Sequence, residues 1–95
     1  MIKMKEIPDY TKSRIKSYNH LIDSLGDTYD ESTDKERFVK KSNELYLDVF
    51  EDRKIISELR IYSVPKPVDD MLKNIERAMN SAISFFRDYK IIKGL

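Results

Sequence analysis

Residues 67–92, PVDDMLKNIERAMNSAISFFRDYKII, carry apolar side chains three and four positions apart along their whole length. This spacing is typical of one face of an α-helix. Pro67 suits the first position of a helix, and Asp69 and Asp70 follow in the first turn, where the helix dipole favours negative charge. The apolar positions cover roughly half of the helix circumference, whereas one neighbour needs a stripe of only about 100°. We therefore predict a long helix with more than one neighbour. The apolar positions are Val68, Met71, Leu72, Ile75, Ala78, Met79, Ala82, Phe85, Phe86, Tyr89 and Ile92.

The segment before this helix predicts a second long helix, from Thr33 to about Tyr62. Thr33 and Glu36 form a capping box, a pattern that starts many helices. The segment Val64-Pro65-Lys66-Pro67 ends the helix, because each proline lacks an N–H and disfavours helical backbone at the residue before it. The two long helices are expected to pack antiparallel. The apolar positions at helical spacing are Phe38, Leu45, Val49, Ile56 and Leu59, flanked by Val39, Tyr46 and Phe50. For the aromatic residues at helical spacing a place in the core is the first interpretation and a protein interface the second. These residues are Tyr18, Tyr46, Phe50, Phe86 and Tyr89.

A shorter helix is predicted near the N-terminus, from about Asp9 to Leu25. Pro8 suits its start, and Gly26 suits a left-handed cap at its end. Residues 27–34 show no periodic spacing of apolar side chains, which predicts a loop. The apolar positions are Ile15, Tyr18, Leu21, Ile22 and Leu25. The sequence thus predicts an all-α fold in one domain, residues 1–95: an elongated bundle of about three helices, two long antiparallel ones and a shorter N-terminal one.

The unequal helix lengths have a consequence for the surface. At about 1.5 Å per residue the long helices extend roughly 40 Å and the N-terminal helix roughly 25 Å. We therefore expect apolar surface near one end of the long pair to remain available to another chain, unless residues 1–7 fold over it.

Composition restricts the function classes. The chain has no cysteine, which excludes disulfides and thiolate chemistry. We expect neither a signal peptide nor a membrane contact, because no run of about 18 apolar residues occurs, and we expect a cytoplasmic protein. Lys and Arg total 18 against 17 for Asp and Glu, a net charge of +1. Any charged partner must therefore be bound by a local patch.

No catalytic, metal or cofactor site is predicted, and the chain is not expected to be an enzyme. His20 is the one histidine, and a zinc site needs three or four ligands. The acidic residues of the predicted loop lack the order of an EF-hand. All-α chorismate mutases are a fold-level alternative of similar size, in which Arg14, Arg53 and Lys54 would have to converge on a dicarboxylate.

Two charged patches and one apolar flank are the candidate binding sites. The acidic ridge Glu44, Asp48, Glu51 and Asp52 is interpreted as a solvated face, with docking of a basic partner as the alternative. The basic residues Lys12, Arg14 and Lys16 predict at most weak phosphate contact. On the last helix, Phe86 lies on the apolar line that is predicted to face the core, whereas Phe85 lies on the apolar flank beside that line. The partner interface is predicted at Ile55, Tyr62, Met71, Phe85, Tyr89 and Ile92.

The order of these elements resembles the α-helical domain of archaeal GINS subunits. The resemblance consists of Ile7-Pro8-Asp9-Tyr10 before the first helix, an acidic loop, a long helix with NELYLDVFEDRKI at residues 43–55, the proline turn, and Phe86-Arg87-Asp88-Tyr89 in the last helix. It implies a non-catalytic scaffold of the DNA-replication machinery that packs on sister GINS subunits and bridges the MCM helicase ring and a RecJ-like partner. The alternative is a homodimeric helical regulatory protein with at most weak binding of nucleic acid.

Overall fold

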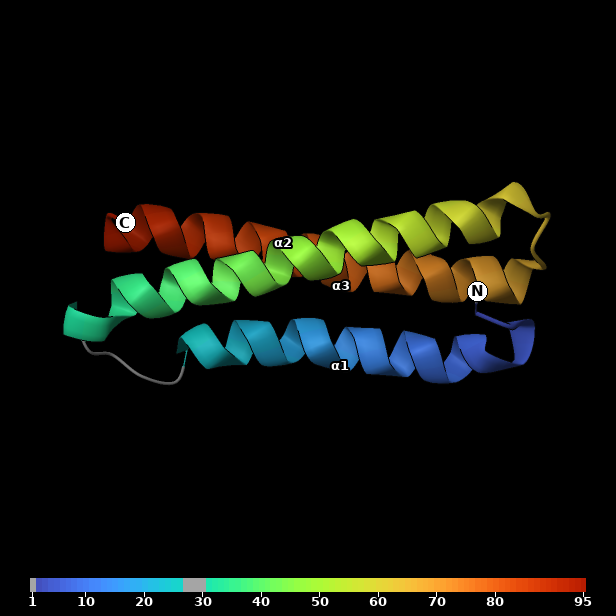
Figure 1. Ribbon diagram of the computed structural model, residues 1–95, viewed down its shortest axis with the longest axis horizontal. Coiled ribbons are helices and arrows are strands. Elements are labelled where there is room, and N and C mark those ends of the chain that lie inside the picture. The colour runs from blue at the N-terminus through green and yellow to red at the C-terminus, as the bar shows by residue number, and fades with distance from the viewer. Residues whose placement is uncertain (1, 27–30) are drawn as a thin grey trace.

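The computed structural model describes residues 2–26 and 31–95, which form a bundle of three α-helices. Helix α1 spans Ile7–Gly26, α2 spans Glu31–Ile61 and α3 spans Lys66–Lys93, and a short 3₁₀ turn at Met4–Glu6 precedes α1. The helices lie side by side, and successive helices run in opposite directions (Figure 1). The bundle measures 48 × 19 × 19 Å. The predicted all-α bundle, with two long antiparallel helices and a shorter N-terminal one, is confirmed.

The starts of α1 and α2 differ from the sequence prediction. Helix α1 begins at Ile7, two residues earlier than expected, and Pro8 is tolerated because the N–H groups of a first turn have no partner within the helix. Helix α2 begins at Glu31, so Thr33 lies inside it and the predicted cap at Thr33 is wrong. The rest of the predicted loop, residues 27–30, lies outside the described part of the chain.

The proline turn lies at the predicted residues, although α3 begins at Lys66, one residue before the predicted Pro67. Pro65 has extended backbone angles, φ −58° and ψ 151°, and its carbonyl accepts the first hydrogen bonds of α3, at 3.0 Å from the Val68 and Asp69 N–H groups. Helix α3 ends at Gly94, whose left-handed conformation, φ 68° and ψ 32°, is one that glycine adopts without a steric penalty. The long helices therefore reverse direction sharply at residues 62–65.

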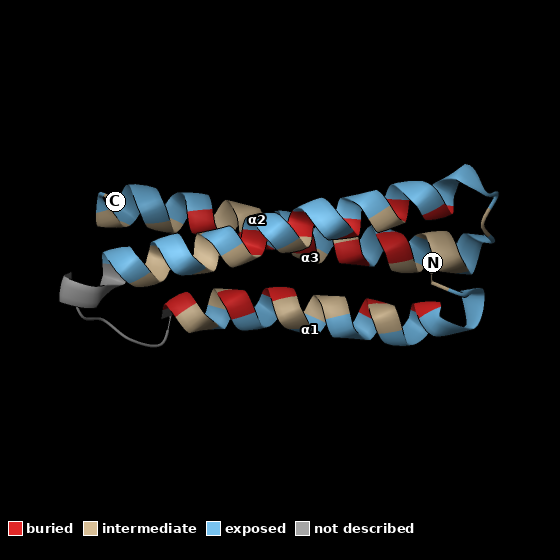
Figure 2. Ribbon diagram, viewed as in Figure 1, coloured by how far each residue is buried: buried red, intermediate tan, exposed pale blue. Residues whose placement is uncertain are grey.

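The core runs along the axis between the three helices (Figure 2). It follows the predicted apolar lines on each helix, and α3 packs most closely along α1, where the fully buried Ala82 permits a close approach. As expected, α3 has two neighbours. The buried apolar residues are Ile7, Tyr18, Leu21 and Leu25 of α1, Leu45, Val49, Ile56 and Leu59 of α2, and Leu72, Ile75, Met79, Ala82 and Phe86 of α3.

The two ends of the bundle differ. At the end where α2 connects to α3, the N-terminal segment folds back over the helices (Figure 1). Ile7 is fully buried, and Ile2 packs against the core. At the other end, α2 and α3 extend past the end of α1, and Ile91 and Ile92 of α3 are exposed. Within residues 2–26 and 31–95, no helix combines the length and the apolar character that crossing a bilayer requires.

Candidate protein-interaction surface

A buried carboxylate ties α1 to α2. Asp52 of α2 is 3% exposed and accepts hydrogen bonds from three side chains of α1. The Tyr10 hydroxyl donates to Oδ1 at 2.7 Å, the Tyr18 hydroxyl to Oδ2 at 2.6 Å, and the Arg14 Nε to Oδ2 at 2.8 Å. The three donors are spaced one helical turn apart on α1, so they share one face. This network fixes the register of α1 against α2.

The network keeps its phenols neutral and its guanidinium charged. Burial and the hydrogen bond to Asp52 raise the pKa of both Tyr10 and Tyr18 above its ordinary value. Burial acts to lower the pKa of Arg14, but the hydrogen bond to Asp52 and the charges of Asp52 and Asp48 outweigh it, so the pKa is raised. Both carboxylate oxygens of Asp52 are therefore engaged within the bundle.

This geometry corrects two predictions. Asp52 belongs neither to a solvated face nor to a docking site, because it is buried. Arg14 is not placed for phosphate contact, because its side chain is only 19% exposed and its guanidinium binds Asp48 at 3.2 Å in addition to Asp52 and lies over the Tyr18 ring. The sequence did contain a signal: Asp52 falls on the core line of α2, between Val49 and Ile56.

The other charged residues of the two patches lie on the α1–α2 side of the bundle. Glu44 binds Lys41 at 3.3 Å, and Glu51 is exposed beside the N-terminal segment. Lys12 and Lys16 are exposed, and they line a shallow groove together with acidic side chains of both helices. His20 is exposed in the same groove. This groove carries charges of both signs, so neither a polyanion nor a polycation has a uniform surface to bind.

The six residues of the predicted apolar interface do not form one surface. Phe85 and Tyr89 are half-buried and pack against the core, and the Tyr89 ring stacks on Phe38 at 5.7 Å. Met71 is half-buried in the same way, and Ile55 lies beside Ile2 of the N-terminal segment. The flank of α3 is covered because its wide apolar face serves two neighbouring helices. The remaining members are exposed but sit at opposite ends of the bundle: Tyr62 and Ile92.

Four of the exposed apolar side chains lie instead on the outer face of α2, and the others lie at the ends of the helices. Val39, Tyr46 and Phe50 follow one another at helical spacing and are 51%, 66% and 70% exposed, with Leu47 beside them. The first interpretation of Tyr46 and Phe50, a place in the core, was wrong. Helical spacing reveals an apolar face but not whether that face points inward, and α2 has one such face on each side. The sequence signal was present as the flank of the predicted core line.

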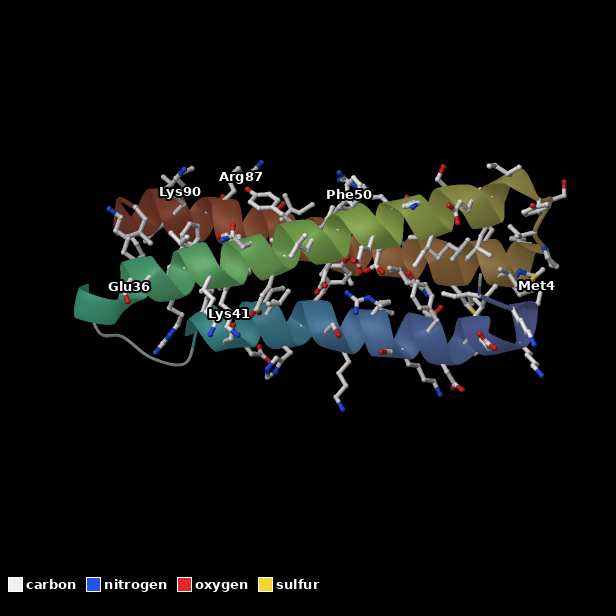
Figure 3. The ribbon with its side chains drawn as sticks, in the orientation of Figure 1. Met4, Glu36, Lys41, Phe50, Arg87 and Lys90 are labelled. Carbon is white, nitrogen blue, oxygen red and sulfur yellow. The ribbon has the colours of Figure 1, made fainter. Side chains whose placement is uncertain are left out.

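A groove runs between this face of α2 and the neighbouring face of α3. Its walls include Val39 and Tyr46 of α2 and Ile83, Arg87 and Lys90 of α3, and an adjoining hollow is lined by Tyr46, Phe50, Arg53 and Lys54. Figure 3 labels Phe50, Arg87 and Lys90 along the edge of the bundle away from α1, whereas Lys41 lies on the side of α2 toward α1. We name these residues the α2–α3 surface: Val39, Tyr46, Phe50, Arg53, Lys54, Ile83, Arg87 and Lys90.

The α2–α3 surface carries charges of one sign. Its four charged members are all cations, and Arg87 makes an exposed ion pair with Asp88 at 3.6 Å. In the part of the chain that the structure describes, Arg53, Lys54 and Lys90 form no ion pair, and no group of three or more His, Asp or Glu side chains could hold a metal ion. Comparison with known proteins finds no matching family model, no matching curated protein and no matching solved structure.

Proposed function

We propose that this chain is a non-catalytic interaction module that binds a partner protein through the α2–α3 surface. The observation that carries the proposal is that α2 is apolar on two sides. A helix at the surface of a bundle needs one apolar stripe, toward the core, and a second stripe in solvent usually marks an interaction site.

The dimensions and the residue types of the surface fit this role. One long side of a bundle of 48 × 19 Å is large enough for a standard interface of about 800 Å² per partner. Exposed aromatic side chains beside arginines are the combination that dominates binding energy in protein interfaces. Completely burying a side chain such as Phe50 contributes about 1.5–3 kcal/mol. Phe50 and Tyr46, adjacent on the surface, are therefore its expected anchors.

The buried polar network supports a structural rather than a chemical role for the polar side chains. General acid–base catalysis requires a group within hydrogen-bond reach of a substrate. The buried carboxylate of this bundle, Asp52, instead has both oxygens bound by α1.

The resemblance to the helical domain of GINS subunits offers one identity for the partner. If it holds, sister GINS subunits or helicase-associated proteins would cover the α2–α3 surface. The alternative partner is a second copy of the chain. Both are tested by the same experiment, because each predicts a different composition of the purified assembly.

The test is purification of the tagged chain from its native cells, followed by light scattering. The double variant Tyr46→Asp/Phe50→Asp places two carboxylates on the surface. The matched control Asn19→Asp/His20→Asp adds the same charge at exposed positions of α1. We expect a stoichiometric partner with the wild type and the control, its loss with the double variant, and the same thermal melts for all three proteins. Retention of the partner by the double variant, or a monomeric wild type without partner, would overturn the proposal.

A further inference from the structure

We infer that the α2–α3 surface takes one α-helix of another protein, amphipathic and flanked by carboxylates. This inference rests on the proposed function and specifies its partner. It follows from three features of the surface: an apolar floor that runs along α2, cations at both ends of that floor, and the absence of acidic side chains among its members.

The apolar floor has the shape of a helix-binding groove. Its first part lies between two antiparallel helices, with Val39 and Tyr46 of α2 on one side and Ile83 of α3 on the other. It continues along α2 to Phe50, in a hollow that α2 alone lines. From Val39 to Phe50 it extends roughly 16 Å at about 1.5 Å per residue, which is about three turns of a partner helix. A helix placed in this groove would complete a four-helix arrangement, a common way to cover two antiparallel helices.

The cations stand at the two ends of the floor. Arg87 and Lys90 of α3 line the hollow that contains Val39 and Tyr46, and Arg53 and Lys54 of α2 line the hollow that contains Phe50. A helix in the groove would therefore meet positive charge near both of its ends. Glutamate side chains that flank its apolar stripe at those positions are the complementary choice, and charge complementarity of this kind determines which partner binds and how fast.

The carboxylates of this chain do not line the two hollows of the surface, although some adjoin its cations. Glu51 and Glu58 share a neighbouring hollow with Lys54, and Glu76, which pairs with Arg60, shares one with Arg53. Asp88 pairs with Arg87. The charged side chains that line the two hollows themselves are all cations, in a chain whose net charge is only +1.

This distribution of charge disfavours a second copy as the occupant. Two copies that met through this face would bring their cations together, without carboxylates from either surface to offset them. A single-stranded nucleic acid would find the cations and two aromatic rings for stacking, Tyr46 and Phe50. The rest of the floor, at Val39 and Ile83, is aliphatic and offers bases neither stacking nor hydrogen bonds. An acidic amphipathic helix would cover the apolar floor with its apolar stripe and pair its carboxylates with the cations.

The test uses two synthetic helical peptides that share one leucine stripe. In the acidic peptide the flanking positions are Glu, and in the basic peptide they are Lys. Binding is measured by fluorescence anisotropy at about 0.1 M salt, where surface charges are only partly screened. We expect the acidic peptide to bind the wild type at least tenfold more tightly than the basic one.

Charge reversal provides the control. The variant Arg53→Glu/Arg87→Glu should prefer the basic peptide, whereas Lys12→Glu/Lys16→Glu, with the same change of net charge on α1, should keep the preference of the wild type. Phe50→Ala should weaken the acidic peptide at least tenfold, and circular dichroism checks that each variant is folded.

Other results would overturn the inference. If the two peptides bind equally, or if Arg53→Glu/Arg87→Glu does not reverse the preference between them, the cations of the surface do not select carboxylates on the partner helix. Binding of a single-stranded oligonucleotide without binding of the acidic peptide assigns the face to nucleic acid, and a dimer that Phe50→Ala dissociates assigns it to a second copy. Failure of the peptides while Tyr46→Asp/Phe50→Asp still loses the native partner would refute the acidic helix and leave the proposed function standing.

Discussion

Replacing Asp52 by Ala removes the acceptor that three side chains of α1 share. Tyr10, Arg14 and Tyr18 would lose hydrogen bonds of 2.6–2.8 Å. Arg14, whose side chain is 19% exposed, would keep only Asp48 as its ionic partner. Removing one partner of a buried ion pair costs about 3–5 kcal/mol. A domain of this size has a total stability of roughly 5–15 kcal/mol. We therefore expect Asp52→Ala to lower the free energy of unfolding by about 3–5 kcal/mol, a large part of the total.

Urea denaturation followed by circular dichroism measures this loss. The matched control is Asp48→Ala, which removes the other carboxylate that binds Arg14, from a position where the side chain is 33% exposed. An exposed pair is worth about 0.2–1 kcal/mol, so the control should change stability little. If Asp52→Ala costs no more than Asp48→Ala, the network does not hold α1 against α2 and the reasoning is refuted.

Two further predictions concern the same core. The pKa values of Tyr10 and Tyr18 are raised above the ordinary 10.0, so above pH 10 the unfolded chain loses these protons first. The free energy of unfolding should therefore fall as the pH rises. In urea titrations at pH 9 to 11, Tyr18→Phe should flatten this dependence, whereas the control Tyr62→Phe, at an exposed position, should not. Replacing Phe86, which is 4% exposed, by Ala should lower the free energy of unfolding by about 3–5 kcal/mol. Replacing Ile92, which is 79% exposed, by Ala should change it by no more than about 0.5 kcal/mol. Equal urea midpoints for the two variants would contradict the placement of the core.

The fold could be predicted from the sequence where a single physical signal determined the structure. The apolar lines through Leu45 on α2 and Ile75 on α3 are buried as expected, because no other arrangement of a helix removes such a line from water. The break at Pro65 was equally determined, since proline ends a helix by its own geometry. The capping signal at Thr33 was local, and it did not determine the start of α2.

The binding surface was harder to predict. Tyr46 and Phe50 have helical spacing, and a sequence alone does not say which of two apolar faces of α2 turns inward. Asp52 carries a charge, which favours the surface, but lies on the apolar line of α2, which faces the core. The three donors on α1 explain how this carboxylate is buried. Phe85 and Tyr89, two members of the predicted interface, are half-buried against the core, because that flank of α3 also packs within the bundle.

Site-specific photocrosslinking in the native cells tests most directly whether α2 presents the binding surface. A benzophenone side chain would replace Tyr46 or Phe50 on α2, and Lys12 or His20 on α1 as controls, all at exposed positions. The account predicts a discrete crosslinked partner from positions 46 and 50 and none from positions 12 and 20. Crosslinks from the α1 positions alone, or from no position, would contradict it.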